Sequence, residues 1–183
     1  LMVMSTLGFV ASLFVPDTEV ATEKAVIKYN IFKETVSCIK YSRKDNDTFL
    51  AILGISWFWL IGGVFMSQMP NFTRYALNGD PSVLVMLLSI FSIGTGIGSI
   101  FCNNLLKGRI DTQYVPISIL LMTASVFCLW YTSTYFESKS ALSGIHYFLS
   151  SLKGIAVCVE IFFIAFFGGI YIVPLYAFLQ IRA

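Results

Sequence analysis

The stretch "IFFIAFFGGIYIVPLYAFLQI", residues 161–181, decides the fold class, because it contains no Asp, Glu, Lys or Arg. An α-helix rises about 1.5 Å per residue, so this stretch reaches about 31 Å, close to the thickness of a bilayer core. It nevertheless includes Gly168, Gly169, Pro174 and Gln180, which weaken a helix or cost free energy in lipid. The stretch predicts a membrane-spanning helix that packs against protein or lines a water-filled cavity.

Three further stretches lack Asp, Glu, Lys and Arg, namely residues 48–73, 81–106 and 112–136. Each exceeds the roughly 20 residues that a spanning helix needs. The chain is 57% hydrophobic and 12% charged, whereas a soluble domain is about 25% charged. We therefore expect an all-α membrane protein with four transmembrane helices, at about residues 49–70, 82–106, 114–135 and 160–181.

Two segments precede these helices. Residues 1–15 are apolar but too short to cross a membrane, and we interpret them as the end of a truncated transmembrane helix. A signal peptide is the rival interpretation, but no basic residue precedes the apolar run. Residues 16–48 form a linker in which Tyr29, Phe32, Val36 and Ile39 recur at helical spacing. This pattern predicts an amphipathic helix, lying in the headgroup plane or covering a soluble partner domain.

Basic residues are concentrated on one side of the predicted helices. Residues 16–48 contain six Lys and Arg, residues 107–113 contain two, and Arg182 follows the last helix, while the other side has Arg74, Lys139 and Lys153. Because cytoplasmic loops retain Lys and Arg, the linker and the 107–113 turn are predicted to be cytoplasmic. These residues indicate a membrane leaflet rather than a nucleic-acid surface, and no nucleic-acid partner is expected.

Small residues recur at helical spacing within the predicted helices. The sequence "SIGTGIGSIFCNN", residues 92–104, places Gly94, Gly98 and Cys102 at four-residue intervals, which predicts a face that a neighbouring helix approaches closely. The segment from Gly168 to Pro174 allows two interpretations. The proline either breaks or bends the helix as a gate, with the glycines letting it close against a neighbour, or fixes a static kink.

Polar residues in the apolar stretches are few. Gln68 stands near Pro70, and its amide either forms a hydrogen bond between helices or lines a cavity. Glu160 is expected at the outer boundary on a helix N-terminus, where a negative charge is favourable, with a coupling role as the alternative. The four cysteines and the single histidine show no metal-binding spacing, so no metal site and no cofactor is expected.

Four segments together carry a family resemblance: "SWFWLIGGVFMSQMP", "FSIGTGIGSIFC", "KGRIDTQYVP" and "FFGGIYIVPLYAFLQ". They resemble the lysophospholipid transporter branch of the major facilitator superfamily. The similarity is greatest to the transporter module often fused to a glycerophospholipid acyltransferase and an acyl-activating enzyme. The resemblance covers nearly all of residues 50–181 and implies a partial major facilitator superfamily fold, from the end of helix six to helix ten of twelve.

The resemblance implies a flippase of the bacterial inner membrane that delivers lysophospholipid to the cytoplasmic leaflet for reacylation. Its partners would be membrane lipids and a fused or associated acyltransferase. The substrate pathway would include Gln68, Asn71, Arg74, Tyr171 and Gln180, and gating or helix packing would involve Gly94, Gly98, Gly168, Gly169 and Pro174.

Two other functions stay open at this point. One is a general major facilitator carrier for drugs or small metabolites, and the other is the membrane module of a multidomain acyltransferase. The chain itself is not expected to be an enzyme, because an acyltransferase needs an H-x-x-x-x-D pair. His146, the single histidine, has Ser151 at the position of the aspartate.

Overall fold

The computed structural model describes residues 2–12, 14, 35–36, 39–40, 43, 45–106, 112–136 and 142–182. The chain divides into two compact units, Leu1–Cys38 and Ile39–Ala183. In the first unit, α1 covers Met2–Ser12, inside the segment interpreted as the end of a membrane helix. The expected amphipathic pattern runs from Tyr29 to Ile39, and only residues 35–36 and 39 of it are among the described residues. Of the basic turn at residues 107–113, only residues 112 and 113 are described.

The second unit is a bundle of helices. Its elements are α3 (Asn46–Asn71), the π-helix η1 (Phe72–Ala76), α4 (Pro81–Leu106), α5 (Val115–Thr134), α6 (Ile145–Ser150) and α7 (Leu152–Arg182). Within the described ranges the only β-structure is an isolated bridge between Gly79 and Ser143. Among the described residues, four helices are long and apolar enough to cross a membrane, in agreement with the expected all-α class and number of spans.

The helix bounds differ from the expected ones at two places. Helix α3 begins at Asn46, where Asp45 precedes it and accepts hydrogen bonds from the Asp47 backbone nitrogen (3.3 Å) and the Thr48 hydroxyl (2.7 Å). Helix α7 begins at Leu152, eight residues before the expected start at 160. The expected start coincided with the end of the charged residues, but Lys153 and Glu160 are accommodated inside the helix.

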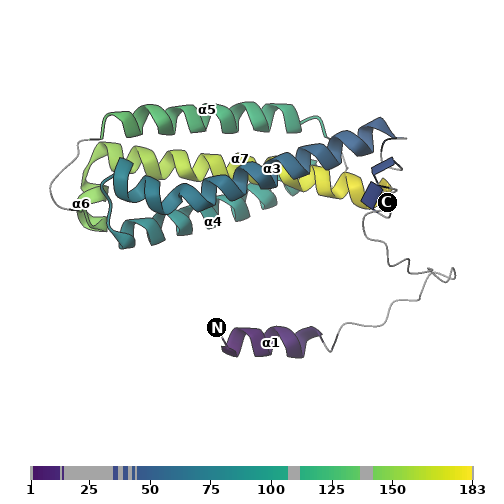
Figure 1. The fold of residues 1–183 in the computed structure, drawn as a ribbon, viewed down its shortest axis with the longest axis horizontal. Helices are drawn as coiled ribbons and strands as arrows, with labels where there is room; N and C mark the ends of the chain where they lie inside the picture. Colours follow the sequence, from purple (N-terminus) through teal and green to yellow (C-terminus); the bar gives the residue numbers. More distant parts are fainter. Residues whose placement is uncertain are drawn as a thin grey trace. The chain divides into compact units, whose positions relative to one another are not determined.

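Helix α7 runs through the middle of the bundle, and α3, α4 and α5 pack along it (Figure 1). The short helix α6 lies where α7 begins, close to η1 and the start of α4. We call this the η1 end of the bundle. The opposite end contains the start of α3 and the end of α7, and we call it the Asn46 end.

Two clusters of buried side chains hold the bundle together. The larger one lies toward the η1 end and is composed of Met69, Leu77, Val83, Leu87, Leu129, Phe148, Val157, Ile161 and Ile164. The smaller one joins α3 to the last turns of α7 through Ala51, Ile55, Tyr171 and Leu175. The Tyr171 hydroxyl donates to the Gly54 carbonyl (3.2 Å), and the Trp59 indole donates to the Tyr176 hydroxyl (2.7 Å). These two bonds fix α3 against α7.

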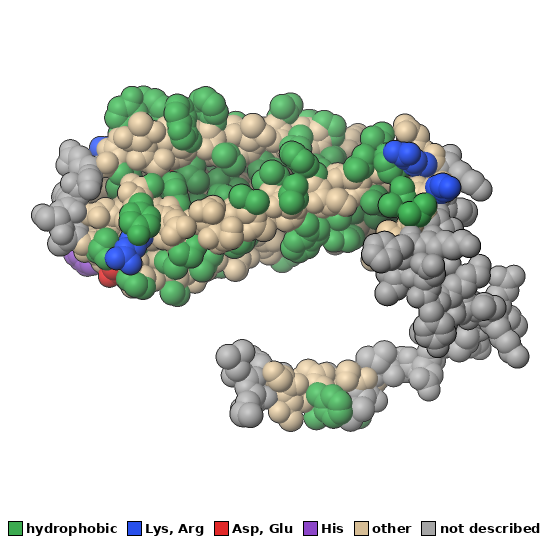
Figure 2. Space-filling model, viewed as in Figure 1, with side chains coloured by type: hydrophobic (Ala, Val, Ile, Leu, Met, Phe, Trp, Pro, Cys, Tyr) green, Lys and Arg blue, Asp and Glu red, His purple; other side chains and the backbone are tan. Residues whose placement is uncertain are grey.

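The outer surface of the bundle is apolar along its length. Large side chains such as Trp57, Leu60, Leu120, Phe127 and Trp130 are more than half exposed. On the face seen in Figure 2, Lys and Arg side chains of the bundle lie near its two ends, with none along the middle. Apolar flanks between charged ends suit helices that are surrounded by lipid or by further helices.

Helices α4 and α7 cross with their backbones in contact. A Cβ atom added at Gly94 would lie 2.7 Å from the Phe162 carbonyl oxygen of α7, and one added at Gly98 would overlap the Phe166 carbonyl. From the other side, a Cβ atom at Gly169 would lie 2.8 Å from the Thr95 carbonyl oxygen. The three glycines therefore form one contact in which no side chain separates the two helices.

This contact predicts opposite effects for two glycines of α4. Gly98→Ala is expected to destabilise the bundle by about 1–3 kcal/mol, because the added methyl group forces α4 and α7 apart. Gly96→Ala is the matched control, since nothing lies within 4 Å of a Cβ atom there. It should be neutral or stabilising by up to about 1 kcal/mol, the helix-propensity gain of alanine. The free energy of unfolding in detergent measures the effect of both substitutions. Equal changes for Gly98→Ala and Gly96→Ala would contradict the close contact.

Candidate functional site

Pro174 does not interrupt α7, which continues as a helix to Arg182. Of the outcomes expected at Pro174, a break, a bend or a static kink, the break is therefore wrong. Proline lacks the N–H that would bond the carbonyl of Ile170 one turn earlier. In the structure the Cys102 thiol of α4 donates to that carbonyl, at 3.7 Å, and Cys102, Ile170 and Pro174 are all buried. The neighbouring helix supplies the donor that the proline removes, so α7 stays helical at this residue.

The two adjacent glycines of α7 face different neighbours. Gly169 contacts the backbone of α4, so there is no room for a side chain. Gly168 faces the Phe58 ring of α3, which would lie 3.4 Å from an added Cβ atom, an ordinary contact distance. In this arrangement Gly169 is a packing residue. The bending gate requires another conformation and stays a prediction.

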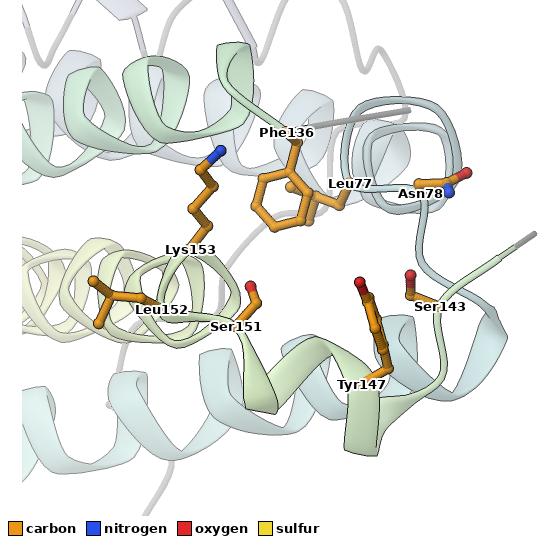
Figure 3. A pocket seen from close by; sticks show the side chains of 8 residues that line it. All are labelled: Leu77, Asn78, Phe136, Ser143, Tyr147, Ser151, Leu152 and Lys153. Carbon is orange, nitrogen blue, oxygen red and sulfur yellow. The ribbon is translucent and has the colours of Figure 1, made fainter. Parts of the chain in front are cut away.

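A pocket of about 320 Å³ lies at the η1 end of the bundle. Its walls come from the loop after η1, the end of α5, the loop before α6, α6 itself and the start of α7. The lining residues are Leu77, Asn78, Phe136, Ser143, Tyr147, Ser151, Leu152 and Lys153. In Figure 3 the hydroxyl groups of Ser143, Tyr147 and Ser151 point to the same side, toward Phe136 and Leu77. The pocket thus combines hydroxyl groups and one ammonium group with an apolar wall.

Each wall of the pocket is fixed by a specific contact. The Phe136 ring stacks on buried Phe148, with ring centres 5.8 Å apart. The Lys153 ammonium donates to the Tyr135 carbonyl at 2.6 Å, and the Ser151 hydroxyl accepts from the Gly154 backbone nitrogen at 3.0 Å. A side chain at Gly154 would overlap the Phe148 carbonyl, so glycine lets α6 fold back onto the start of α7.

The two loops at the η1 end are joined by backbone hydrogen bonds. Ser143 donates to the Asn78 carbonyl (2.8 Å), and Asp80 donates to the Ser143 carbonyl (3.1 Å). Asn78 has a positive φ of 50°, a conformation that asparagine tolerates better than most residues. The Asp80 carboxylate accepts from the backbone nitrogens of Ser82 (2.9 Å) and Val83 (3.1 Å), so it caps α4. The hydrogen bond from the Ser82 side chain is the largest of the effects that lower the pKa of Asp80 below its usual range.

None of the residues predicted to form a substrate pathway lines this pocket. Gln68 and Asn71 are exposed and bonded to each other, the Asn71 amide donating to the Gln68 side-chain oxygen at 3.3 Å. Arg74 is exposed, with its guanidinium 5.8 Å from the centre of the Tyr75 ring. Tyr171 is buried in the contact with α3, and Gln180 is exposed near the Asn46 end. The structure does not bring these five residues together around one cavity.

Sequence analysis did not select the residues that form the pocket. Lys153 entered only as one of the three basic residues on the less basic side. Ser151 entered only as the residue at the aspartate position of an H-x-x-x-x-D pair, and Ser143 and Tyr147 were not singled out. A signal was present in "SSLKG", residues 150–154, where hydroxyl groups precede a lone lysine and a glycine at the start of a long apolar run. The pocket itself depends on the return of α6 onto α7, which no local pattern indicates.

Glu160 does not lie at a helix N-terminus. It is the ninth residue of α7, about 12 Å along the axis from Leu152, whereas helix-end effects are limited to the first turn. The capping interpretation of Glu160 is therefore wrong. Its Oε1 atom accepts a hydrogen bond from the Thr132 hydroxyl of α5 at 2.7 Å.

No protein-family model, curated protein or solved structure matches the chain.

The Cys102 and Pro174 contact predicts a thermodynamic coupling between the two residues. Cys102→Ala removes the donor to the Ile170 carbonyl, whereas Pro174→Ala restores the backbone donor within α7. Cys102→Ala should therefore cost about 0.6 kcal/mol less in the Pro174→Ala background, the average for a hydrogen bond between membrane helices. A double-mutant cycle of unfolding free energies measures this difference. An equal cost of Cys102→Ala in both backgrounds would show that the thiol does not compensate for the proline.

The Asp80 cap predicts a pH-dependent stability. A carboxyl whose pKa is lowered by folding stabilises the protein above its ordinary value of about 3.9, and this contribution is lost as the pH falls through the folded value. Asp80→Ala should lower the midpoint of thermal unfolding at neutral pH, and the difference from the unaltered protein should narrow in acid. Asp47→Ala, at the start of α3, is the control and should change the midpoint less. A difference for Asp80→Ala that stays constant with pH would contradict the charged cap.

Proposed function

We propose that this chain is part of a membrane transporter that moves lysophospholipid to the cytoplasmic leaflet of a bacterial inner membrane, where it is reacylated. The family resemblance of residues 50–181 suggests this substrate and this direction. Four helices of membrane-spanning length support the membrane location. The observation that carries the proposal is the composition of the pocket at the η1 end.

A lysophospholipid has an anionic phosphate, a free hydroxyl and a single acyl chain. The pocket offers the Lys153 ammonium for the phosphate and the hydroxyls of Ser143, Tyr147 and Ser151 for hydrogen bonds. Phe136, Leu77 and Leu152 line the same space and would contact the glycerol and the first carbons of the chain. A volume of about 320 Å³ suits a headgroup and leaves the acyl chain outside, against the apolar flank of the bundle.

Transport also needs a contact that can rearrange. Glycine faces such as the one between α4 and α7 let two helices slide past each other, because no interlocked side chains have to be repacked. Alternating access in carriers is a movement of one group of helices against another. In this proposal the contact formed by Gly94, Gly98 and Gly169 is where α4 and α7 change position, and the chain's role is transport rather than catalysis.

The pocket residues and the substrate are tested together by a flipping assay. The protein, reconstituted into vesicles, should accelerate transbilayer movement of a fluorescent lysophospholipid but not of its diacyl parent. Lys153→Gln should slow this movement about tenfold or more, since one lost charged hydrogen bond is worth about 1.5–3 kcal/mol. Arg74→Gln is the matched control, because it removes one positive charge outside the pocket. It should have little effect.

Other outcomes would favour other functions. Acceleration of small drugs or metabolites, without acceleration of lysophospholipid, would favour a general major facilitator carrier. No transport of any of these substrates by a folded protein would favour the membrane module of an acyltransferase. An Arg74→Gln defect larger than that of Lys153→Gln would move the headgroup site from the pocket to the exposed residues of α3 and η1.

A further inference from the structure

Glu160 lies in the contact between α5 and α7, and only one of its two carboxyl oxygens has a hydrogen-bond partner among the residues that the structure describes. Thr132 donates to Oε1, whereas Oε2 is buried and has no partner in the described part of the chain. Buried polar atoms in proteins are almost always paired, and an unpaired one needs an explanation. The free oxygen therefore indicates a ligand or a protonation state that the hydrogen bonds alone do not reveal.

No positive charge in the described bundle pairs with Glu160. Helices α4 and α5 contain no charged residue, and α3 has only Asp47, at the Asn46 end. On α7, Lys153 lies two turns earlier and its ammonium is bonded to the Tyr135 carbonyl, while Cys158 is the nearest other titratable group in sequence. Arg74 of η1 is exposed with its guanidinium over Tyr75, and His146 of α6 is exposed.

The Glu160 side chain is half-buried, but its Oε2 atom is inaccessible to solvent, so an ionised carboxylate would be only partly hydrated. A buried charge needs a counter-charge or several hydrogen bonds, and Glu160 has one hydroxyl donor. A metal ion requires several ligands, and the described residues hold no group of three His, Cys, Asp or Glu side chains that would supply them. An organic cation requires space, but Glu160 does not line the described pocket. A proton is the cation that needs neither further ligands nor a cavity.

We propose that Glu160 is a proton-binding site that links proton uptake to the contact between α5 and α7. Binding one proton converts the carboxylate into a neutral carboxylic acid, which remains in the contact between α5 and α7 with its hydrogen bond to Thr132. Releasing the proton restores the negative charge, which then requires water. The Oε2 atom gains water when the last turn of α5 moves away from α7. The closed contact therefore binds the proton more tightly than the open one.

This inference goes beyond the proposed function, because it assigns an energy source rather than a substrate. Proton entry from one side of the membrane would close the contact, and proton release would open it. Thr132 lies in the last turn of α5, near the η1 end, so the movement would occur beside the pocket. Proton binding by Glu160 does not depend on which substrate the protein moves. The experiments that test it therefore do not measure transport.

Infrared spectroscopy of the reconstituted protein tests the protonation directly. Across a range from mildly acidic to alkaline pH, we expect a carboxylic acid C=O band that disappears with increasing pH. Glu160→Gln should remove this band. Thr132→Val keeps the carboxyl and removes its hydrogen bond, so it should shift the band. This second variant identifies Glu160 even if Glu160→Gln fails to fold.

Thermal unfolding in detergent tests the link to the helix contact. The unaltered protein should be more stable at the acidic end of this range. Glu160→Gln, which resembles the protonated form, should lose most of the pH dependence, whereas Thr132→Val should be less stable but keep it. The proposal is overturned if no carboxylic acid band responds to either substitution, or if a folded Glu160→Gln protein keeps the full pH dependence.

Discussion

The structure depends on the backbone contact between α4 and α7. Gly94 and Gly98 on one helix and Gly169 on the other bring the two main chains together without intervening side chains. Inside a bilayer, apolar side chains gain little by moving from lipid to protein, so association relies on dense packing and hydrogen bonds. This contact fixes α7 in the middle of the bundle, where α3 and α5 pack along its remaining sides.

A central position lets α7 contain groups that an isolated membrane helix would tolerate poorly. Pro174 leaves the Ile170 carbonyl without its helical partner, and Cys102 of α4 supplies a donor. Glu160 introduces a carboxyl group, and Thr132 of α5 bonds one of its oxygens. In each case the partner comes from a neighbouring helix, so the helicity of α7 and the packing of the bundle support each other.

The sequence allowed the helices to be predicted but not the partners of their polar groups. Long runs without charge predicted four spans. The four-residue spacing of Gly94, Gly98 and Cys102 predicted a face that a neighbouring helix approaches closely, and the structure shows that this helix is α7. The start of α7 was placed too late, because a change in charge was taken as the end of the helix, although Leu152 begins it. The pocket and the Cys102 hydrogen bond join residues far apart in the chain, and local spacing contains no information about such pairs.

The Ile170 carbonyl and the Glu160 carboxyl group of α7 differ in whether their hydrogen-bonding atoms all have partners. The Ile170 carbonyl needs one donor, and the Cys102 thiol satisfies it in a contact so close that a side chain at Gly169 would collide with α4. Glu160 keeps one oxygen without a partner, at the contact with α5, where the interface is made by side chains rather than by glycine backbones. A satisfied contact gains nothing by opening, whereas an ionised Glu160 gains hydration. The contact between α5 and α7 is therefore the one at which a change of charge would alter the bundle.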